Sequence, residues 1–372
     1  MTSVPNQVCT RCVMDTTAGD IRFDRDGVCN YCTRFLDRAR HVIQPDPAVQ
    51  RQQLDALVAT VKAKGRGRRY DCIVGVSGGV DSSWVLVNAV KLGLRPLAVH
   101  MDNGWNSELA QNNIANLVRG LGVDLHTHVI NWPEYRGLMQ AFFDADVIDV
   151  ELLYDNAMLA VNFHMAAKMG VKHMLSGVNH VTEGMDMPHA WVWNKFDRRN
   201  IVSIGRRNGV RLDTFPAIGT LGRLWLGLAR GIRWEWFLDL LPYNKFEALE
   251  VLGRDFGYKP YPYKHYESVF TRFYQGFILP TKFGVDKRRV HLSTLVISGQ
   301  MTRAQALEGL QGIPYPSAEA LEDDKVYFLK KMGWSAAQLD QYLARPPKSH
   351  ATYGSEARFF EFCIRLRNRM RG

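Results

Sequence analysis

The stretch that most constrains the fold of this chain is "CIVGVSGGVDSSW", residues 72–84. An apolar run stops at a serine and two glycines, and an amphipathic segment then begins beside an aspartate. A strand that turns into a helix through Gly-Gly exposes several backbone N–H groups at the positive end of the helix dipole. Glycine lets this backbone approach a ligand closely and adopt positive φ. The turn therefore predicts an anion-binding nest, with the hydroxyls of Ser77, Ser82 and Ser83 as additional donors.

Predicted strands and helices alternate on both sides of this turn. Strands are expected at 70–76, 95–102, 124–131 and 171–179, and the longest intervening helix covers 152–169. This alternation predicts an α/β fold with a doubly wound parallel sheet. Ligands bind such sheets at the carboxyl ends of the strands. We therefore expect the site at three loops, residues 77–83, 100–105 and 176–183.

The turn differs from the common phosphate-binding loops. It lacks the lysine of G-x-x-x-x-G-K-[ST] and the spacing of G-x-G-x-x-G, and carries Asp81 at the start of the helix instead. A carboxylate there can simply favour the helix dipole. Beside a bound pyrophosphate, however, it would repel the ligand unless a cation lay between them. A Mg²⁺ shared by Asp81 and phosphate oxygens resolves that conflict.

The residues "SGGVDSS" resemble the SGGxDS signature of the PP-loop ATP pyrophosphatases, which include GMP synthetase, NAD synthetase, asparagine synthetase and several tRNA-modifying enzymes. The resemblance implies that the chain binds ATP, activates a carbonyl oxygen as its adenylate and releases pyrophosphate. It also implies ATP contacts from the turn and from the ends of the second and fourth strands. These expected ATP-binding residues are Val76, Ser77, Gly78, Gly79, Asp81, Ser82, Ser83, His100, Met101, Asp102, Ser176 and Gly177.

Four of the six cysteines fall within the first 32 residues, as Cys9, Cys12, Cys29 and Cys32. Their pattern, C-x₂-C, sixteen residues, C-x₂-C, matches a Cys₄ zinc site. Four thiolates leave no open coordination position, so we expect a structural role that supplies folding energy to a small module. An iron–sulfur cluster and a redox pair remain as alternatives.

Composition sets further expectations. The chain has 372 residues, 46% of them hydrophobic, and a formal net charge of +10. Three regions are expected: a zinc module with its linker at 1–45, an ATP pyrophosphatase domain at 46–215, and a mostly helical substrate or partner region at 216–372. No apolar run is long enough for a membrane span and no secretory signal is evident, so we expect a cytoplasmic protein. The basic surface suits an anionic substrate, whereas the absence of charge blocks argues against a nucleic-acid tail.

The segment 221–241 places leucines and tryptophans at helical spacing. This pattern predicts a buried or partner-facing helix, with a surface-seeking amphipathic helix as the alternative. A homo-oligomer also stays open.

Motifs spread over most of the chain resemble the N-acetyl sugar amidotransferase family. They are "CTRCVMDTT" (9–17), "GVCNYC" (27–32), "NKFDRRNI" (194–201), "PYNKFEALEVL" (242–252) and the long stretch from residue 264 to 307. The resemblance implies conversion of an acetamido group on a sugar to an acetamidino group. Such reactions serve bacterial surface-polysaccharide synthesis, including the O-antigen of lipopolysaccharide, and flagellin-glycan synthesis. The expected acceptor is an anionic, nucleotide-linked N-acetylated sugar.

The resemblance also implies roles for particular side chains. Expected catalytic residues are Asp81, Asn179, Lys264 and Lys287. Expected substrate-binding residues are Asp155, Asn156, Asn179, Glu183, Lys195, Arg288 and Arg289. From the residues alone, each cation could instead belong to a solvated basic face, and Asp155 and Asn156 could only cap a helix.

Two cysteines, Cys72 and Cys363, remain outside the proposed zinc site, in an apolar strand and in a terminal amphipathic helix. Neither lies in a loop at the expected site, which argues against sulfur transfer. No glutaminase nucleophile is evident, so we expect ammonia from a separate glutaminase subunit or from solution. A tRNA thiolation enzyme and a non-catalytic nucleotide- or RNA-binding module are the alternative hypotheses.

Overall fold

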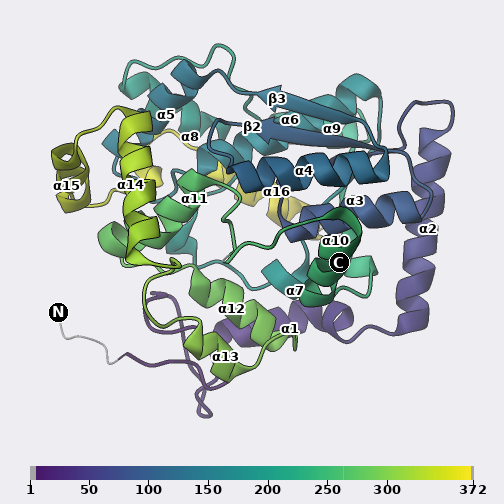
Figure 1. Ribbon diagram of the computed structural model, residues 1–372, viewed down its shortest axis with the longest axis horizontal. Helices are drawn as coiled ribbons and strands as arrows, with labels where there is room; N and C mark the ends of the chain where they lie inside the picture. Colours follow the sequence, from purple (N-terminus) through teal and green to yellow (C-terminus); the bar gives the residue numbers. More distant parts are fainter. Residues whose placement is uncertain (1–5, 263, 370–372) are drawn as a thin grey trace.

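The computed structural model describes residues 6–262 and 264–369. Its centre is a five-stranded, all-parallel sheet with the strand order β3-β2-β1-β4-β5 (Figure 1). The strands are β1 (Cys72–Gly75), β2 (Pro96–Asp102), β3 (Leu125–Val129), β4 (His173–Leu175) and β5 (Arg233–Glu235). The predicted fold class is confirmed, including the four-cysteine segment at one end of the chain and a mostly helical C-terminal region.

Helices cover the sheet and form most of the second half of the chain (Figure 1). They are α1 (Asn30–Ile43), α2 (Pro47–Gly65), α3 (Val80–Lys91), α4 (Glu108–Leu121), α5 (Trp132–Asp144), α6 (Leu152–Met169), α7 (His180–Glu183), α8 (Arg198–Arg207), α9 (Thr220–Leu228), α10 (Lys245–Phe256), α11 (Val269–Phe273), α12 (Arg288–Ile297), α13 (Arg303–Glu308), α14 (Ala318–Met332), α15 (Ala336–Ala344) and α16 (Ala357–Arg369). Short 3₁₀ turns lie at η1 (His189–Trp191), η2 (Phe237–Leu240) and η4 (His350–Thr352), and η3 (Tyr274–Phe283) is a π-helix.

Both faces of the central strand β1 are buried, as a doubly wound sheet requires. Cys72 and Val74 pack into one apolar cluster with residues of α2, α3 and α10, whereas Ile73 packs into the other with residues of α5 and α6. Burial raises the pKa of the Cys72 thiol well above its usual value. This side chain therefore serves as a small apolar residue and is poorly placed to act as a thiolate.

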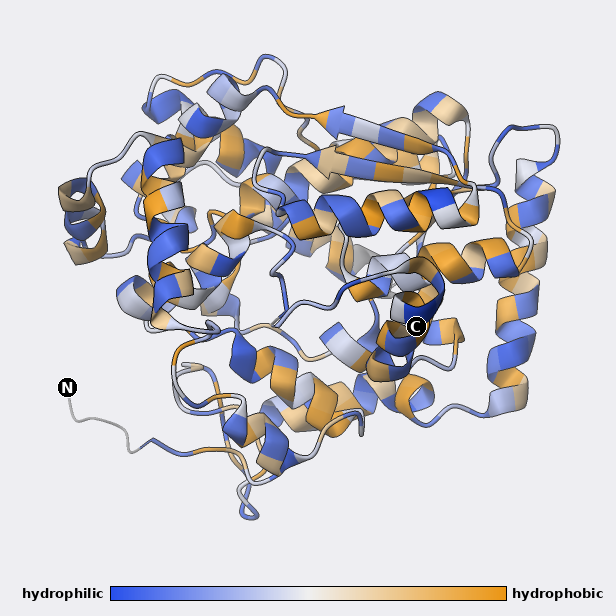
Figure 2. Ribbon diagram, in the orientation of Figure 1, coloured by the Kyte–Doolittle hydropathy of each residue, from blue (hydrophilic) through white to orange (hydrophobic). Residues whose placement is uncertain are grey.

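The edge strand β3 is more polar than its neighbour. Figure 2 shows blue and white along much of β3, where β2 is mostly orange. Side chains of β3 alternate between exposed and half-buried positions, whereas those of β2 are buried almost throughout. The exposed positions are Leu125, Thr127 and Val129, and the half-buried ones are His126 and His128, so the strand is short and of mixed polarity.

The segment 221–241 does not form one helix, so that prediction was wrong. Helix α9 ends at Leu228, and Gly231 takes a left-handed conformation with φ of 64°. Glycine adopts this conformation without a steric penalty, and here it lets the chain leave the helix. The next residues form β5, which pairs with β4 and adds a fifth strand. The sheet thus includes residues from beyond the expected boundary at 215.

The N-terminal module packs against C-terminal helices. The backbone N–H of Val13 donates to Ser293 Oγ on α12 at 3.1 Å. Arg289, also on α12, lies 2.9 Å from the carboxylate of Asp15. Arg303 of α13 donates to the carbonyls of Cys9 and Cys12. These contacts make the module a brace for α12, although the two are far apart in sequence.

Within the described residues, no helix combines the length and the apolar character needed to cross a lipid bilayer.

Candidate active site

The loop after β1 has the geometry of an anion nest. Gly78 has φ of 87°, a conformation that side-chain-bearing residues rarely adopt, and Gly79 is the N-cap of α3. The Ser77 hydroxyl accepts from Gly79 N–H at 3.3 Å. The hydroxyls of Ser82 and Ser83 both donate to the Gly79 carbonyl, at 3.2 and 2.8 Å. The loop is thus fixed by its own hydroxyls. It leads directly into the N-terminus of α3, a helix of twelve residues.

Neighbouring elements hold this loop in place. Tyr258 and Tyr261 both donate to the Gly78 carbonyl, at 2.9 and 3.1 Å. A Cβ on Gly78 would come within 3.1 Å of Ala110, and one on Gly177 within 2.9 Å of a backbone nitrogen in α3. The loop after β1 therefore lies against α4, and the loop after β4 lies against the first turn of α3, so both of these glycines are required by close approach.

Asp81 projects from the first turn of α3 into a cluster of polar groups. Its carboxylate accepts from the Tyr243 hydroxyl, and Thr182 Oγ1 lies at 3.4 Å. Burial raises the pKa of Asp81, and the neighbouring Lys264 opposes that shift. A carboxylate desolvated in this way gains most from a cation, because a cation removes the cost of its buried charge.

Two lysines lie beside that carboxylate. Lys264 Nζ pairs with Glu183 at 2.7 Å. Burial lowers the pKa of Lys245, and the charge of Lys264 lowers it further. Among the described residues, the Lys245 ammonium has no hydrogen-bond or ion-pair partner. A phosphate bound here would supply one, so this cluster fits a polyphosphate better than it fits the protein alone.

The end of β2 positions its predicted residues through a loop. His100 Nδ1 donates to the Val76 carbonyl at 2.8 Å, while Nε2 accepts from Asn106 at 2.9 Å, an assignment that follows from the partners. Asp102 accepts from the backbone N–H of Gly104 at 2.8 Å. These side chains therefore fix the wall of the nest, and Met101 lies buried between them in the strand.

The loop after β4 is held by Asn179. This fully buried residue caps α7 by accepting from Thr182 N–H at 2.8 Å, and its amide donates to the Gly177 carbonyl at 2.9 Å. Ser176 accepts from Val178 N–H at 3.0 Å. Asn179 thus places Thr182 beside Asp81, and its role as a catalytic residue stays a prediction.

A second polar cluster lies around the start of α6. Lys195 Nζ bridges Asp149 and Asp155, at 2.7 and 2.8 Å. Lys287 pairs with Glu151 at 2.5 Å, and both side chains are almost completely buried. We call these five residues the α6 cluster. Asp155 and Lys195 remain partly exposed, so this end of the cluster is open to a ligand.

Three other residues that were predicted to bind substrate contact groups of the protein itself. Asn156 is fully buried and donates to the carbonyls of Lys195 and Ile218, at 2.8 and 2.7 Å. Arg288 pairs with Asp286 at 2.8 Å, and Arg289 pairs with the N-terminal module. Their predicted contacts with substrate stay predictions, since each of these three side chains already has protein partners.

Sequence reasoning missed several members of both clusters. Tyr243 and Lys245 lie inside the quoted motif 242–252. The motif therefore indicated this region, but these two residues were not predicted as members of the site. Thr182 lies in the expected 176–183 loop. Asp149 and Glu151 precede the helix that carries Asp155, and nothing in their local sequence distinguishes them from helix-start carboxylates.

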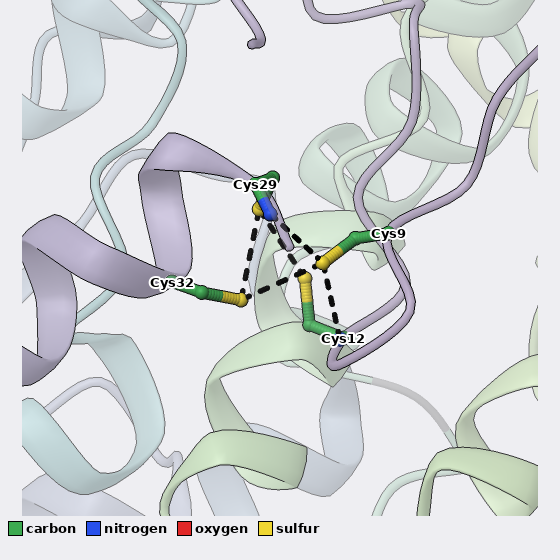
Figure 3. A group of neighbouring side chains, drawn as sticks. All are labelled: Cys9, Cys12, Cys29 and Cys32. Atoms are coloured by element: carbon green, nitrogen blue, oxygen red, sulfur yellow. Dashed lines mark hydrogen bonds between the residues drawn. The ribbon is translucent and has the colours of Figure 1, made fainter. Parts of the chain in front are cut away.

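The four N-terminal cysteines form a compact, fully buried cluster. Figure 3 shows their sulfur atoms converging from the 9–12 loop and from the start of α1. Three Sγ–Sγ distances, Cys9–Cys32, Cys12–Cys29 and Cys29–Cys32, are 3.8, 3.7 and 3.6 Å. Tetrahedral thiolates around zinc, with Zn–S bonds of about 2.3 Å, would lie about 3.8 Å apart. The cluster can therefore bind a metal, and backbone N–H groups of Cys12, Met14 and Cys29 point at its sulfurs.

An exposed apolar surface lies on α9 and α16. Leu221, Trp225 and Leu228 recur along α9 with 68, 56 and 83% of their surfaces exposed, and Phe359 and Phe362 of α16 are also exposed. We call these five residues the α9–α16 surface. Clustered exposed apolar side chains of this size commonly mark an interaction site.

A cavity of about 600 Å³ opens at this surface. Trp225, Phe359, Arg198 and Arg199 are among its lining residues, and Ile218 contributes to its wall. It lies apart from the nest, because none of its lining residues comes from the loops after β1 or β2.

Comparisons with known proteins were made with the whole chain. Residues 267–367 match the family model described as LPS biosynthesis protein WbpG-like, C-terminal domain. The predicted relationship to a surface-polysaccharide biosynthesis family is confirmed for this part of the chain. A search of curated proteins found no match.

Several solved structures resemble the chain distantly. NMN synthetase from Francisella tularensis is 14% identical, with 62% of this chain and 92% of that chain covered and a TM-score of 0.31. An NH₃-dependent NAD synthetase from Campylobacter jejuni is 15% identical, with 56 and 84% covered and a TM-score of 0.29. A 4-thiouridine synthetase solved with RNA and ATP is 18% identical, with 51 and 42% covered and a TM-score of 0.29. These likenesses are too weak to inform on activity.

Proposed function

We propose that this chain is an ATP-dependent N-acetyl sugar amidotransferase. In this reaction the acetamido oxygen of a nucleotide-linked sugar attacks the α-phosphorus of ATP, and pyrophosphate leaves. Ammonia then adds to the carbon of the resulting O-adenylyl imidate, and AMP leaves to give an acetamidino sugar. The setting would be synthesis of a bacterial surface glycan, in keeping with the family match of residues 267–367.

The observation that carries the proposal is the cluster beside the nest. Asp81 and Lys264 are both half-buried and act on each other through their charges, and Lys245 offers an ammonium with no partner among the described residues near both. Backbone N–H groups of the Ser77–Gly79 turn supply neutral donors for phosphate oxygens. This combination suits a polyphosphate whose terminal part departs as an anion.

Asp81 fits a role in Mg²⁺ binding. It lies in the first turn of α3, and within the described residues it belongs to no group of three or more acidic, histidine or cysteine side chains that could hold an ion by themselves. Mg²⁺ is often held by one or two carboxylates together with substrate phosphates. When bound, the ion would neutralise charge on the departing pyrophosphate, and the two lysines would contribute to the same task.

The α6 cluster is the proposed site for the acceptor sugar. Its exposed members Asp155 and Lys195 provide an acceptor and a donor for sugar hydroxyls or an anionic group. The buried pair Glu151 and Lys287 then sets the position of α12 against the start of α6. Lys287 also falls within the region that the family model matches.

We assign the four-cysteine cluster to structural zinc. The closed set of four thiolates leaves no position for a substrate. Arg303 and Arg289 bind the module to α13 and α12, so the metal would hold the helix that carries Lys287.

The defining experiment supplies the chain with ATP, an ammonium salt and a nucleotide-linked diacetamido uronic acid. We expect AMP and pyrophosphate in equal amounts, and a sugar lighter by the mass difference between O and NH. AMP formed with tRNA and a sulfur donor, and with none of a panel of acetamido sugars, would instead identify a thiolation enzyme. Tight ATP binding with no pyrophosphate release under any condition would identify a non-catalytic module.

The α9–α16 surface fits a separate glutaminase subunit as the source of ammonia. Asn156, which binds the Ile218 carbonyl and N–H, connects the cavity wall to Lys195 of the α6 cluster. The cavity wall and the proposed acceptor site are therefore joined through one hydrogen-bonded residue, Asn156. A second copy of this basic chain is a poorer occupant, because like-charged surroundings would repel it.

A charged residue introduced into this surface should affect turnover with glutamine and turnover with ammonium salt differently. We expect Trp225→Glu to reduce glutamine-dependent turnover with the glutaminase subunit by roughly tenfold or more, because interface tryptophans often dominate binding. Turnover with ammonium salt should stay unchanged. Val326→Glu, at an exposed position on α14, is the matched control. Equal loss with both nitrogen sources, or loss with neither, would exclude this docking face.

A further inference from the structure

Helix α12 places a histidine between the nest and the α6 cluster. His291 follows Lys287 by one helical turn, so both project from the same face. Burial lowers the pKa of His291 well below its usual value. The positive charges of Lys264, His265, Lys287 and Lys245 lower it further. Residues of both clusters therefore surround one neutral imidazole.

The imidazole has an unused nitrogen. His291 Nε2 is buried and has no hydrogen-bond partner among the described residues. The ring of His265 lies nearby, with centroids 5.2 Å apart. Buried polar atoms in proteins are nearly always paired. An unpaired nitrogen in a region rich in donors and ions thus indicates that a bound substrate supplies its missing hydrogen-bond partner.

The other ionisable groups around His291 are already engaged. Glu183 of α7, the helix packed against α12, pairs with Lys264, and Glu267 lies 3.6 Å from His265. Both carboxylates have pKa values lowered by these cations, so they are weak bases. His291, in contrast, keeps a buried Nε2 with no partner among the described residues, so its lone pair is free to take a proton.

We propose that His291 is the catalytic base of the second half-reaction, a role that rests on the proposed function. Ammonia forms the new C–N bond and becomes positively charged. Nε2 of His291 takes one proton from that nitrogen. The C–O bond to AMP then breaks, its electron pair leaves with the AMP phosphate, and the amidinium product forms. The imidazolium afterwards releases its proton to solvent.

The cationic surroundings suit this role. Lys264, Lys245 and Lys287 disfavour ammonium in the site and favour neutral ammonia, the form that attacks. They also keep His291 neutral before the step. Because the imidazolium is disfavoured among these charges, its proton is released readily, and the base is regenerated for the next turnover.

The test uses the variant His291→Gln, in which the side chain stays polar but can no longer act as a base. Adenylation of the sugar and attack by ammonia are measured separately. With ATP and the diacetamido sugar alone, sugar-dependent exchange of labelled pyrophosphate into ATP should stay within a few-fold of wild type. With ammonium salt, acetamidino product should form about 10²–10⁴-fold more slowly, the usual contribution of a positioned base. His189→Gln, at an exposed histidine on η1, is the matched control and should change neither rate.

Hydroxylamine gives a second readout that a structural role would not move. Its adduct loses a proton to water far more readily than the ammonia adduct, so a missing base matters less. We expect His291→Gln to approach wild type with hydroxylamine and to stay impaired with ammonia. A deficit of equal size with both nucleophiles, or loss of pyrophosphate exchange, would overturn the assignment.

Failure of the proposed function would look different. In that case the wild-type chain itself would show no sugar-dependent exchange and no acetamidino product. A separate measurement, NMR titration of the histidine signals, should find the His291 ring neutral down to pH values below the ordinary histidine range. A ring that is already protonated at the pH of the assay would contradict the proposed base independently of activity.

Discussion

Replacing Asp81 by Asn is expected to lower AMP formation by at least about 10²–10³-fold, the usual cost of removing one group that stabilises developing charge. The amide cannot attract Mg²⁺ beside the departing pyrophosphate. Its oxygen can still accept from the Tyr243 hydroxyl, so the local packing should survive. The measurement is the rate of AMP and pyrophosphate release with saturating ATP, ammonium salt and the diacetamido sugar.

Stability provides the control for this variant. Because burial raises the pKa of Asp81, the folded protein binds its proton more tightly than the unfolded chain does. The protonated carboxyl therefore contributes stability that is fully present below the unfolded pKa and is lost as pH rises through the folded pKa, so the ionised form costs stability at neutral pH. Asp81→Asn removes this cost and should unfold at the same or a higher temperature at neutral pH. Activity within a few-fold of wild type would contradict the assigned role.

The second large effect is expected from Cys29→Ser. The variant should lose its zinc, since a Cys₄ site depends on every ligand and structural zinc contributes roughly 10–16 kcal/mol in isolated zinc-finger peptides. We expect a much lower unfolding temperature and a metal content near zero by elemental analysis. Activity should fall too, because the module braces α12, on which His291 lies.

Cys363→Ser is the matched control, since this half-exposed residue of α16 lies outside the cluster. It should retain zinc, stability and turnover. Purified wild-type protein that contains iron and absorbs visible light would replace the zinc assignment by an iron–sulfur cluster. Retention of metal by Cys29→Ser with unchanged stability would remove the structural role altogether.

Much of the fold was predictable because local pattern and tertiary role agree. The helix at 152–169 matches α6 in both bounds, with Gly170 in a left-handed conformation directly after it. The four longer predicted strands all occur. β5 is three residues long, as β4 is, and it was missed because the leucines and tryptophans around it continue a helical spacing.

The candidate site, too, contains residues that the sequence predicted and residues that it did not. The nest was predictable since glycine positions and a helix start follow from local chemistry. Tyr243, Lys245 and His291 reach the nest only through folding of the C-terminal region, which no local pattern encodes. Conversely, Asn156 and Arg288 carry promising side chains, but tertiary structure engages them with backbone carbonyls and a neighbouring carboxylate.

The contact between the N-terminal module and α12 has a consequence for synthesis of the chain. Val13 and Ser293, which form one of its hydrogen bonds, are 280 residues apart. On the ribosome, the cysteines emerge and can bind their metal long before α12 exists. A module loaded with metal, as proposed, would then stay partly uncovered until Arg289 and Arg303 emerge and bind to it. Completion of the active site is therefore one of the last events of biosynthesis, and a truncated chain should carry metal without carrying activity.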